Sequence, residues 1–124
     1  MSEQMQKRVR GEGHLWKLSK LCVSDSTRWF GDQGVHTSVP HMTLAMCGEA
    51  GEVANVVKKI ERGSLDMRDA STRVALAGEI TDVLVYLLNL AGMMNIDLDI
   101  AFDSVRANNE RRFSEERRNR EAKK

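Results

Sequence analysis

The chain has 124 residues, which is enough for one domain with a real core but short enough that association between copies would help to stabilise it. Its 19 basic and 18 acidic side chains leave a formal charge of +1, so bulk charge indicates neither a nucleic-acid partner nor a membrane partner. We expect no apolar run long enough to span a bilayer. Cys22 and Cys47 lack the spacing of a zinc site, which favours reduced thiols in a soluble, cytoplasmic protein.

The sequence predicts an all-α fold, an antiparallel four-helix bundle that associates with further copies. A single proline, few aromatic residues and few alternating β-branched runs support this class. Apolar spacing and capping residues predict four helices: at about 14–29, from a boundary at 38–40 to about 62, from a cap at Asp66 or Asp69 to Met93 or Met94, and from a cap at Asp97 or Asp99 to Phe113. We assign residues 1–113 to one domain and 114–124 to a basic, frayed tail.

Two of the predicted helices each carry a pair of carboxylates three residues apart, in segments otherwise rich in apolar residues. The pairs are Glu49 with Glu52 and Glu79 with Asp82. Residues at this spacing share one face of an α-helix. The helix around Glu79 is apolar nearly all round, which is typical of a helix buried in a bundle. Buried acids are costly unless a cation or a set of donors compensates them, so these four are candidate metal ligands and catalytic residues.

Four carboxylates favour a hard divalent cation, Mg²⁺ or Mn²⁺, and Mg²⁺ usually completes its coordination with waters and substrate phosphates. A phosphate substrate is thereby implied. A di-iron carboxylate site is the competing interpretation, but no histidine lies three residues after any of the four acids.

Other polar residues share a helix face with the acids. Tyr86 and Asn89 share the stripe of Glu79 and Asp82, so this stripe is expected to face a site. Lys59 lies on the face of Glu52 and is a candidate for substrate binding, with a salt bridge or compensation of the helix dipole as the alternative.

Three glycines lie in the interiors of the two acid-bearing helices, at Gly48, Gly51 and Gly78. Each costs about 1 kcal/mol relative to alanine. We therefore expect a neighbouring helix or a ligand to approach closely beside the acids.

The sequence closely resembles the MazG-like branch of the all-α nucleoside triphosphate pyrophosphatases. The residues that carry the resemblance are 44–53, 58–60, 63, 78–84, 86 and 87. That superfamily is recognised by ExxE followed, after a spacer, by ExxD, and it includes MazG and the dimeric dUTPases. The resemblance covers about 42–113. A downstream KNxxR cluster of the family is similar to residues 108–112, where Asn108 stands in place of the usual lysine. Lys59 and Arg111 are the alternative sources of that lysine's phosphate contact.

The resemblance implies Mg²⁺-dependent hydrolysis of a nucleoside triphosphate to the monophosphate and pyrophosphate, with Mn²⁺ as a substitute metal. It also implies a homodimer or homotetramer, and it assigns Asn109 and Arg112 to binding of the triphosphate. Clustered carboxylates agree with this chemistry, because bound metals generate hydroxide and neutralise phosphate charge. One of the four acids can instead orient the attacking water.

Two other classes of function remain open. A non-catalytic helical interaction or regulatory protein would keep the fold and use the polar stripe only for contacts between subunits, although four retained acids argue against it. A nucleic-acid binder would use the basic segment 106–124, and its affinity would fall steeply with salt.

Overall fold

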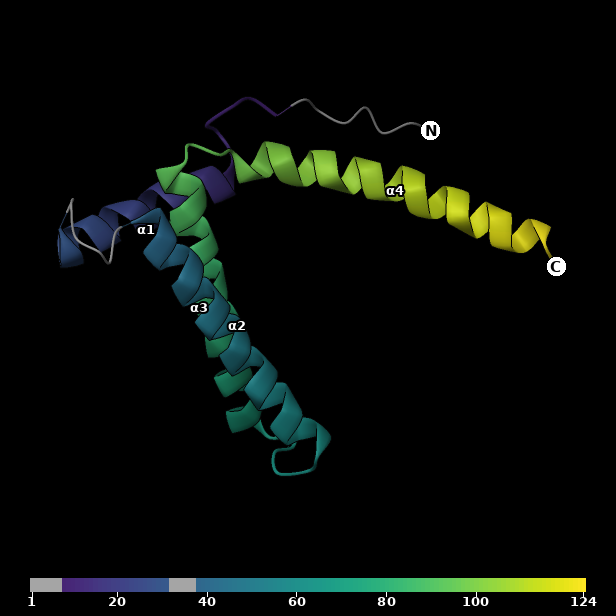
Figure 1. Cartoon of the computed structure of the whole chain (residues 1–124), viewed down its shortest axis with the longest axis horizontal. Coiled ribbons are helices and arrows are strands. Elements are labelled where there is room, and N and C mark those ends of the chain that lie inside the picture. Colours follow the sequence, from purple (N-terminus) through teal and green to yellow (C-terminus); the bar gives the residue numbers. More distant parts are fainter. Residues whose placement is uncertain (1–7, 32–37) are drawn as a thin grey trace.

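The computed structural model describes residues 8–31 and 38–124, and these residues form four α-helices without a strand (Figure 1). The all-α class is therefore confirmed, and the four predicted helices are present, the first three with nearly the predicted bounds. The helices are α1 (His14–Phe30), α2 (Val39–Glu61), α3 (Ala70–Met93) and α4 (Leu98–Ala122).

α2 and α3 lie side by side as a helical hairpin, which forms one arm of the molecule (Figure 1). Local signals set the ends of this hairpin. The Ser38 Oγ accepts a hydrogen bond from the backbone N–H of His41, and Pro40 lies in the first turn of α2, where a missing N–H costs nothing. Gly63 has a φ of +84°, the left-handed conformation that suits glycine after a helix.

α1 packs across the C-terminal half of α3. Gly92 allows this close approach, because a Cβ built there would lie 2.6 Å from Val23 and 2.7 Å from the carbonyl oxygen of Ser19. The Ser26 hydroxyl donates a buried 2.9 Å hydrogen bond to the side-chain oxygen of Asn89. The tightly packed core is therefore small and lies at the α1 end of the arm.

α4 packs against α1 near its own beginning and then leads away from the α2–α3 arm (Figure 1). It continues without a break to Ala122, beyond Phe113, where the sequence placed the end of the regular helix. Residues 114–122 are therefore part of α4.

α3 carries more exposed apolar surface than expected of a helix buried in a bundle. Val74 is 71% exposed, and Ile80, Leu84 and Leu87 are also exposed. By length and composition, Ala70–Met93 is apolar enough to cross a membrane, so the expectation that no apolar run approaches this length was wrong. A carboxylate such as that of Asp82 would cost about 2.5–3.5 kcal/mol at the centre of a bilayer, which weighs against a membrane span here.

Candidate metal centre

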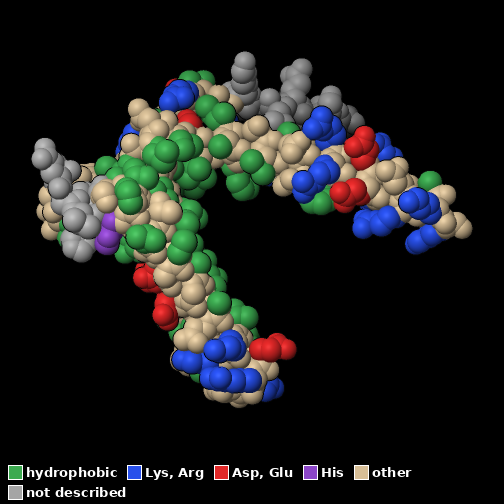
Figure 2. Space-filling model, in the orientation of Figure 1, with side chains coloured by type: hydrophobic (Ala, Val, Ile, Leu, Met, Phe, Trp, Pro, Cys, Tyr) green, Lys and Arg blue, Asp and Glu red, His purple; other side chains and the backbone are tan. Residues whose placement is uncertain are grey.

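Three of the four predicted acids converge midway along the α2–α3 arm. Carboxylate oxygens of Glu49, Glu79 and Asp82 all lie within 4.8 Å of one another. Glu49 and Glu79 are half-buried, whereas Asp82 is exposed, so the group lies at the edge of the contact between the two helices. Figure 2 shows acidic side chains on this flank of the arm, with basic side chains at its tip and along α4.

The electrostatics of this acid cluster are unfavourable for three ionised groups. Partial burial raises the pKa of Glu49, and the charges of Asp82, Glu79 and Glu52 raise it further. Within 8–31 and 38–124, no N–H, hydroxyl or cationic group donates to Glu49, Glu79 or Asp82. A positive charge from outside these residues would relieve the repulsion.

Glu52 does not join the other three acids in this compact group, although it is close enough to raise the pKa of Glu49. It is exposed and lines a shallow, open hollow of about 380 Å³ on α2. Its neighbours there include Gly51, Asn55 and Lys58. The sequence interpretation named neither Asn55 nor Lys58 as a site residue, although their spacing from Gly51 places all three on one face of the helix.

The glycines beside the acids face open space. A Cβ built at Gly48, Gly51 or Gly78 would meet nothing within 4 Å. The expected close approach of a neighbouring helix is therefore not made by the described part of this chain. Because Gly48 lies four residues before Glu52 and Gly78 four before Asp82, this free space adjoins the acids.

The side chains of the polar stripe predicted on α3 lie in two different environments. Tyr86 is half-buried, like Glu79. Asn89 is 2% exposed, and its side chain accepts from Ser26 and donates to the carbonyl of Val85 at 3.0 Å. The expectation that Asn89 faces a site was wrong, because α1 covers that end of the stripe.

The predicted phosphate-binding residues are not gathered at the acids. Lys59 is half-buried on α2 and forms no ion pair within the two described stretches of chain. Asn109 is half-buried and Arg112 exposed, and both lie on the part of α4 that leads away from the arm. The Arg112 guanidinium lies 4.5 Å from the ring centroid of Phe113.

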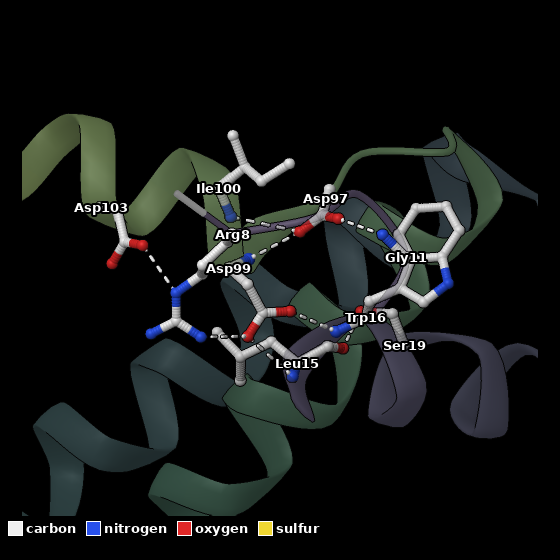
Figure 3. Close-up of polar contacts among 9 residues, drawn as sticks. All are labelled: Arg8, Gly11, Leu15, Trp16, Ser19, Asp97, Asp99, Ile100 and Asp103. Carbon is white, nitrogen blue, oxygen red and sulfur yellow. Dashed lines mark hydrogen bonds and ion pairs between the residues drawn. The ribbon is translucent and has the colours of Figure 1, made fainter. Parts of the chain in front are cut away.

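A second group of carboxylates, at the α1–α4 junction, accepts hydrogen bonds from donors of the same chain (Figure 3). Asp99, at the start of α4, accepts from the backbone N–H groups of Leu15 at 3.2 Å and Trp16 at 2.9 Å, so it caps α1 from another helix. The Arg8 guanidinium lies 3.7 Å from the same carboxylate and donates to Asp103 at 2.6 Å.

Asp97 completes the junction. It caps its own helix by accepting from the N–H groups of Asp99 and Ile100, and it also accepts from Gly11 N–H at 2.9 Å. These bonds, led by the one from Gly11, lower the pKa of Asp97. The sequence had named Asp97 or Asp99 as the cap of the fourth helix, and only Asp97 has that role.

The two groups of acids differ in what they can bind. At the junction, Asp97 and Asp99 accept from backbone N–H groups, whereas the acid cluster presents oxygen atoms that accept nothing from the described residues. Three carboxylates at this spacing suit a hard cation such as Mg²⁺ or Mn²⁺, which binds oxygen ligands and retains waters. The acid cluster therefore fits a divalent metal ion.

Comparison with known proteins agrees with this geometry. The sequence profile of the MazG nucleotide pyrophosphohydrolase domain matches residues 37–117, which include the acid cluster and the cluster at 108–112. The chain is also similar to the Gene 37 protein of Mycobacterium phage L5, with 35% identity over 81 residues, covering 64% of this chain and 71% of the phage protein.

Proposed function

Because the chain belongs to the MazG nucleotide pyrophosphohydrolase domain family, we propose that it hydrolyses a nucleoside triphosphate to the monophosphate and pyrophosphate, with Mg²⁺ bound at the acid cluster. The observation that carries the proposal is the convergence of Glu49, Glu79 and Asp82 within 4.8 Å, with no donor to them among residues 8–31 and 38–124. Such a cluster is unfavourable on its own and favourable with a divalent cation. We expect Mn²⁺ to substitute, since it prefers the same oxygen ligands.

The three clustered carboxylates would hold the metal, and Glu52 would serve either as a further ligand or as the group that orients the attacking water. A bound divalent ion supplies an activated water and neutralises the phosphate oxygens. The raised pKa of Glu49 means that its proton must leave before it binds a cation, so metal affinity should rise with pH.

Cationic and amide side chains are needed for the triphosphate, which carries more negative charge than one metal ion compensates. We assign this role to Asn109 and Arg112, and to Lys59 because it lies on the Glu52 side of α2. The guanidinium of Arg112 is suited to phosphate because its fork of N–H donors matches the phosphate oxygens.

The bond that breaks is proposed to lie between the α and β phosphates. Enzymes that attack the γ phosphate commonly use a GxxxxGK[ST] loop, and the sequence contains no such motif. Carboxylates on rigid helices can hold metal and water beside the α phosphorus, with basic groups on the departing pyrophosphate.

Hydrolysis in ¹⁸O-labelled water tests this assignment. Label is expected in the nucleoside monophosphate and not in pyrophosphate. Label in orthophosphate, with a nucleoside diphosphate as co-product, would contradict the proposed bond cleavage. A complete lack of hydrolysis across ribo-, deoxyribo- and damaged-base triphosphates would instead favour the non-catalytic interaction protein.

A further inference from the structure

We propose that the distal end of α4, residues 117–124, binds the phosphate backbone of duplex DNA independently of base sequence. We call these eight residues the distal basic segment. The segment lies outside the proposed catalytic machinery, because it contains none of the four acids and none of the residues assigned to the triphosphate. The match to the MazG domain also ends at residue 117, so the family does not account for the segment.

The distal basic segment concentrates positive charge in a chain that is otherwise slightly acidic. Five of its eight side chains are basic and one, Glu121, is acidic, which gives a formal charge of +4. The remainder of the chain carries 14 basic and 17 acidic side chains, a formal charge of −3. A short run so rich in arginine and lysine is typical of surfaces that bind nucleic acid or another polyanion.

The cations of this segment are not used by the fold. All of residues 117–124 are exposed. Arg117 forms a 3.0 Å ion pair with Glu121 on the same helix, and no carboxylate of residues 8–31 and 38–124 pairs with the other four basic side chains. The negative end of the helix dipole favours cations in the last turn of α4, but Arg117 and Arg118 precede that turn. The charge of the segment is therefore available to an external anion.

Three of the cations form one face of the helix, which we call the basic face: Arg117, Arg120 and Lys124. They follow one another by three and four residues, so they lie within about 60° around the axis and span about 10 Å along it. Lys123 lies beside this face, whereas Arg118 lies on the other side of the helix. Duplex DNA presents one phosphate charge per about 1.7 Å of its axis, so a face of this length spans several phosphates.

α4 holds the basic face clear of the other described helices. The helix packs against α1 near its own beginning and leads away from the α2–α3 arm (Figure 1). Arg117 lies about 28 Å along α4 from Leu98, and Figure 2 shows basic side chains extending to the end of the helix. An α-helix with its side chains is about 10–12 Å wide, which matches the B-DNA major groove of about 12 Å. The end of α4 can therefore enter this groove without a collision with α1, α2 or α3.

The composition of the segment distinguishes duplex DNA from other anionic partners. After Phe113, α4 contains no large apolar residue. A helix that lies in a membrane surface needs an apolar face to bury, and a protein interface is usually centred on aromatic or other apolar anchors. Guanidinium groups alone are suited to phosphate oxygens, because their N–H donors bind these oxygens in pairs. The major groove of duplex RNA is too narrow for side chains to enter.

Fluorescence anisotropy with two labelled DNA duplexes of unrelated sequence, each of about 20 base pairs, tests the proposal. EDTA is included, so that no metal draws phosphate to the acid cluster. We expect equal affinity for the two duplexes. Three to five phosphate contacts predict that this affinity falls about 40- to 500-fold between 50 and 200 mM salt. A chain that does not bind either duplex at 50 mM salt would overturn the proposal.

A pair of matched variants tests whether the basic face makes the contact. One variant replaces the three cations of the basic face by glutamine. The control removes the same total charge from exposed positions on α1 and at the end of α2, by Lys17→Gln, Arg28→Gln and Arg62→Gln. We expect the first variant to bind DNA at least about 10-fold more weakly, with a salt dependence smaller by about three contacts, and the control to change less than about 3-fold. Equal losses in the two variants would show diffuse attraction and overturn the proposal.

Single substitutions within the segment give the same test with less change to the helix. Arg120→Gln should lower the slope of log affinity against log salt by about 1, whereas Arg118→Gln, on the other side of α4, should leave it unchanged. Circular dichroism should show wild-type helix content in both. Equal slopes for the two variants would contradict the assignment of the contact to the basic face.

Other polyanions test the choice of partner. Single-stranded DNA and duplex RNA of the same length should bind more weakly than duplex DNA, as should vesicles with about 30% phosphatidylserine. Tighter binding to any of these three would overturn the assignment to duplex DNA. None of these measurements depends on hydrolysis, so failure of the DNA proposal would leave the proposed function intact.

Discussion

The α1–α4 junction and the acid cluster of the α2–α3 arm both contain several carboxylates, but only those of the junction accept hydrogen bonds from the described residues. Asp99 is almost completely buried and is satisfied by two backbone N–H groups. Asp82 is exposed and lies beside Glu49 and Glu79. The charges that shift the pKa of Glu49 all come from acids, namely Asp82, Glu79 and Glu52. The presence or absence of hydrogen-bond donors within the chain, rather than burial, therefore distinguishes a structural carboxylate from a candidate metal ligand.

The glycines of the two regions show the same difference. At Gly13, an added Cβ would collide with the carboxyl group of Asp99, so the fold itself explains that glycine. At Gly48 and Gly78 an added Cβ would meet open space, although each glycine weakens its helix by about 1 kcal/mol. The glycine of the junction is explained by a contact within the chain, whereas those of the arm leave open space beside the acids.

Removal of one acid from the arm should give the largest effect on activity. We expect Glu79→Gln or Asp82→Asn to lower kcat by on the order of 100-fold or more, because loss of even an indirect metal contact commonly costs 10–100-fold. Circular dichroism should show retained helix, and thermal stability without metal should be equal or higher because like charge is removed. Near-normal turnover in these variants would exclude the two residues from catalysis.

Arg112→Ala should have the next largest effect. Loss of a charge-assisted contact to phosphate, worth about 1.5–3 kcal/mol, corresponds to a decrease in kcat/KM of about 10–100-fold. Steady-state kinetics with Mg²⁺ measures it, and Arg118→Ala is the matched control. An unchanged kcat/KM for Arg112→Ala would place this side chain on a solvated face of α4.

The junction should respond in stability rather than in metal binding. Asp99→Ala removes the acceptor for two N–H groups at the start of α1 and is expected to lower the free energy of unfolding by about 2 kcal/mol. Gly13→Ala should also destabilise, because its Cβ would displace the same carboxylate. Urea denaturation measures both changes. If either variant weakened metal binding at the arm as strongly as Asp82→Asn, the separation of the two regions would be wrong.

The free energy of unfolding should change with pH by a smaller amount and in a predictable direction. The pKa of Glu49 is raised in the folded chain. At pH values above the ordinary glutamate pKa of about 4.3, the folded state therefore binds more protons than the unfolded state. The free energy of unfolding should therefore fall as pH rises through the raised pKa, in the absence of metal. Asp97 acts in the opposite sense, because its lowered pKa gives stability that is lost as pH falls below its ordinary value.

Denaturant titrations between about pH 4 and 7 in EDTA, with Glu49→Gln as the comparison, measure the Glu49 effect. The variant should show a flatter decline. An identical pH profile would show that Glu49 is not titrating differently in the two states.

The features that sequence predicted well are those set by near neighbours along the chain. The Ser38 cap, the stop at Gly63 and the pairing of Glu79 with Asp82 depend on residues within one or two helical turns. Such signals survive in any tertiary context that keeps the helix.

The features that sequence missed depend on contacts between distant segments. Asp99 and Leu15 are 84 residues apart, and no local pattern indicates that one caps the helix of the other. Asn89 lies on the predicted polar stripe, but the helical angle does not reveal that Ser26 covers it. Likewise, the face of Glu52 was predicted, whereas its place outside the compact group of acids follows from how α2 packs on α3.

Direct binding of Mn²⁺ to the metal-free chain tests the central claim that the acid cluster is a metal centre. Isothermal titration calorimetry, with free Mn²⁺ confirmed by electron paramagnetic resonance, should show saturable binding to the wild-type chain and to Asp99→Asn. Binding should be lost or at least about 10-fold weaker in Asp82→Asn and Glu79→Gln. Equal Mn²⁺ affinity in the wild-type, Asp82→Asn and Glu79→Gln chains would contradict the assignment of these carboxylates as metal ligands.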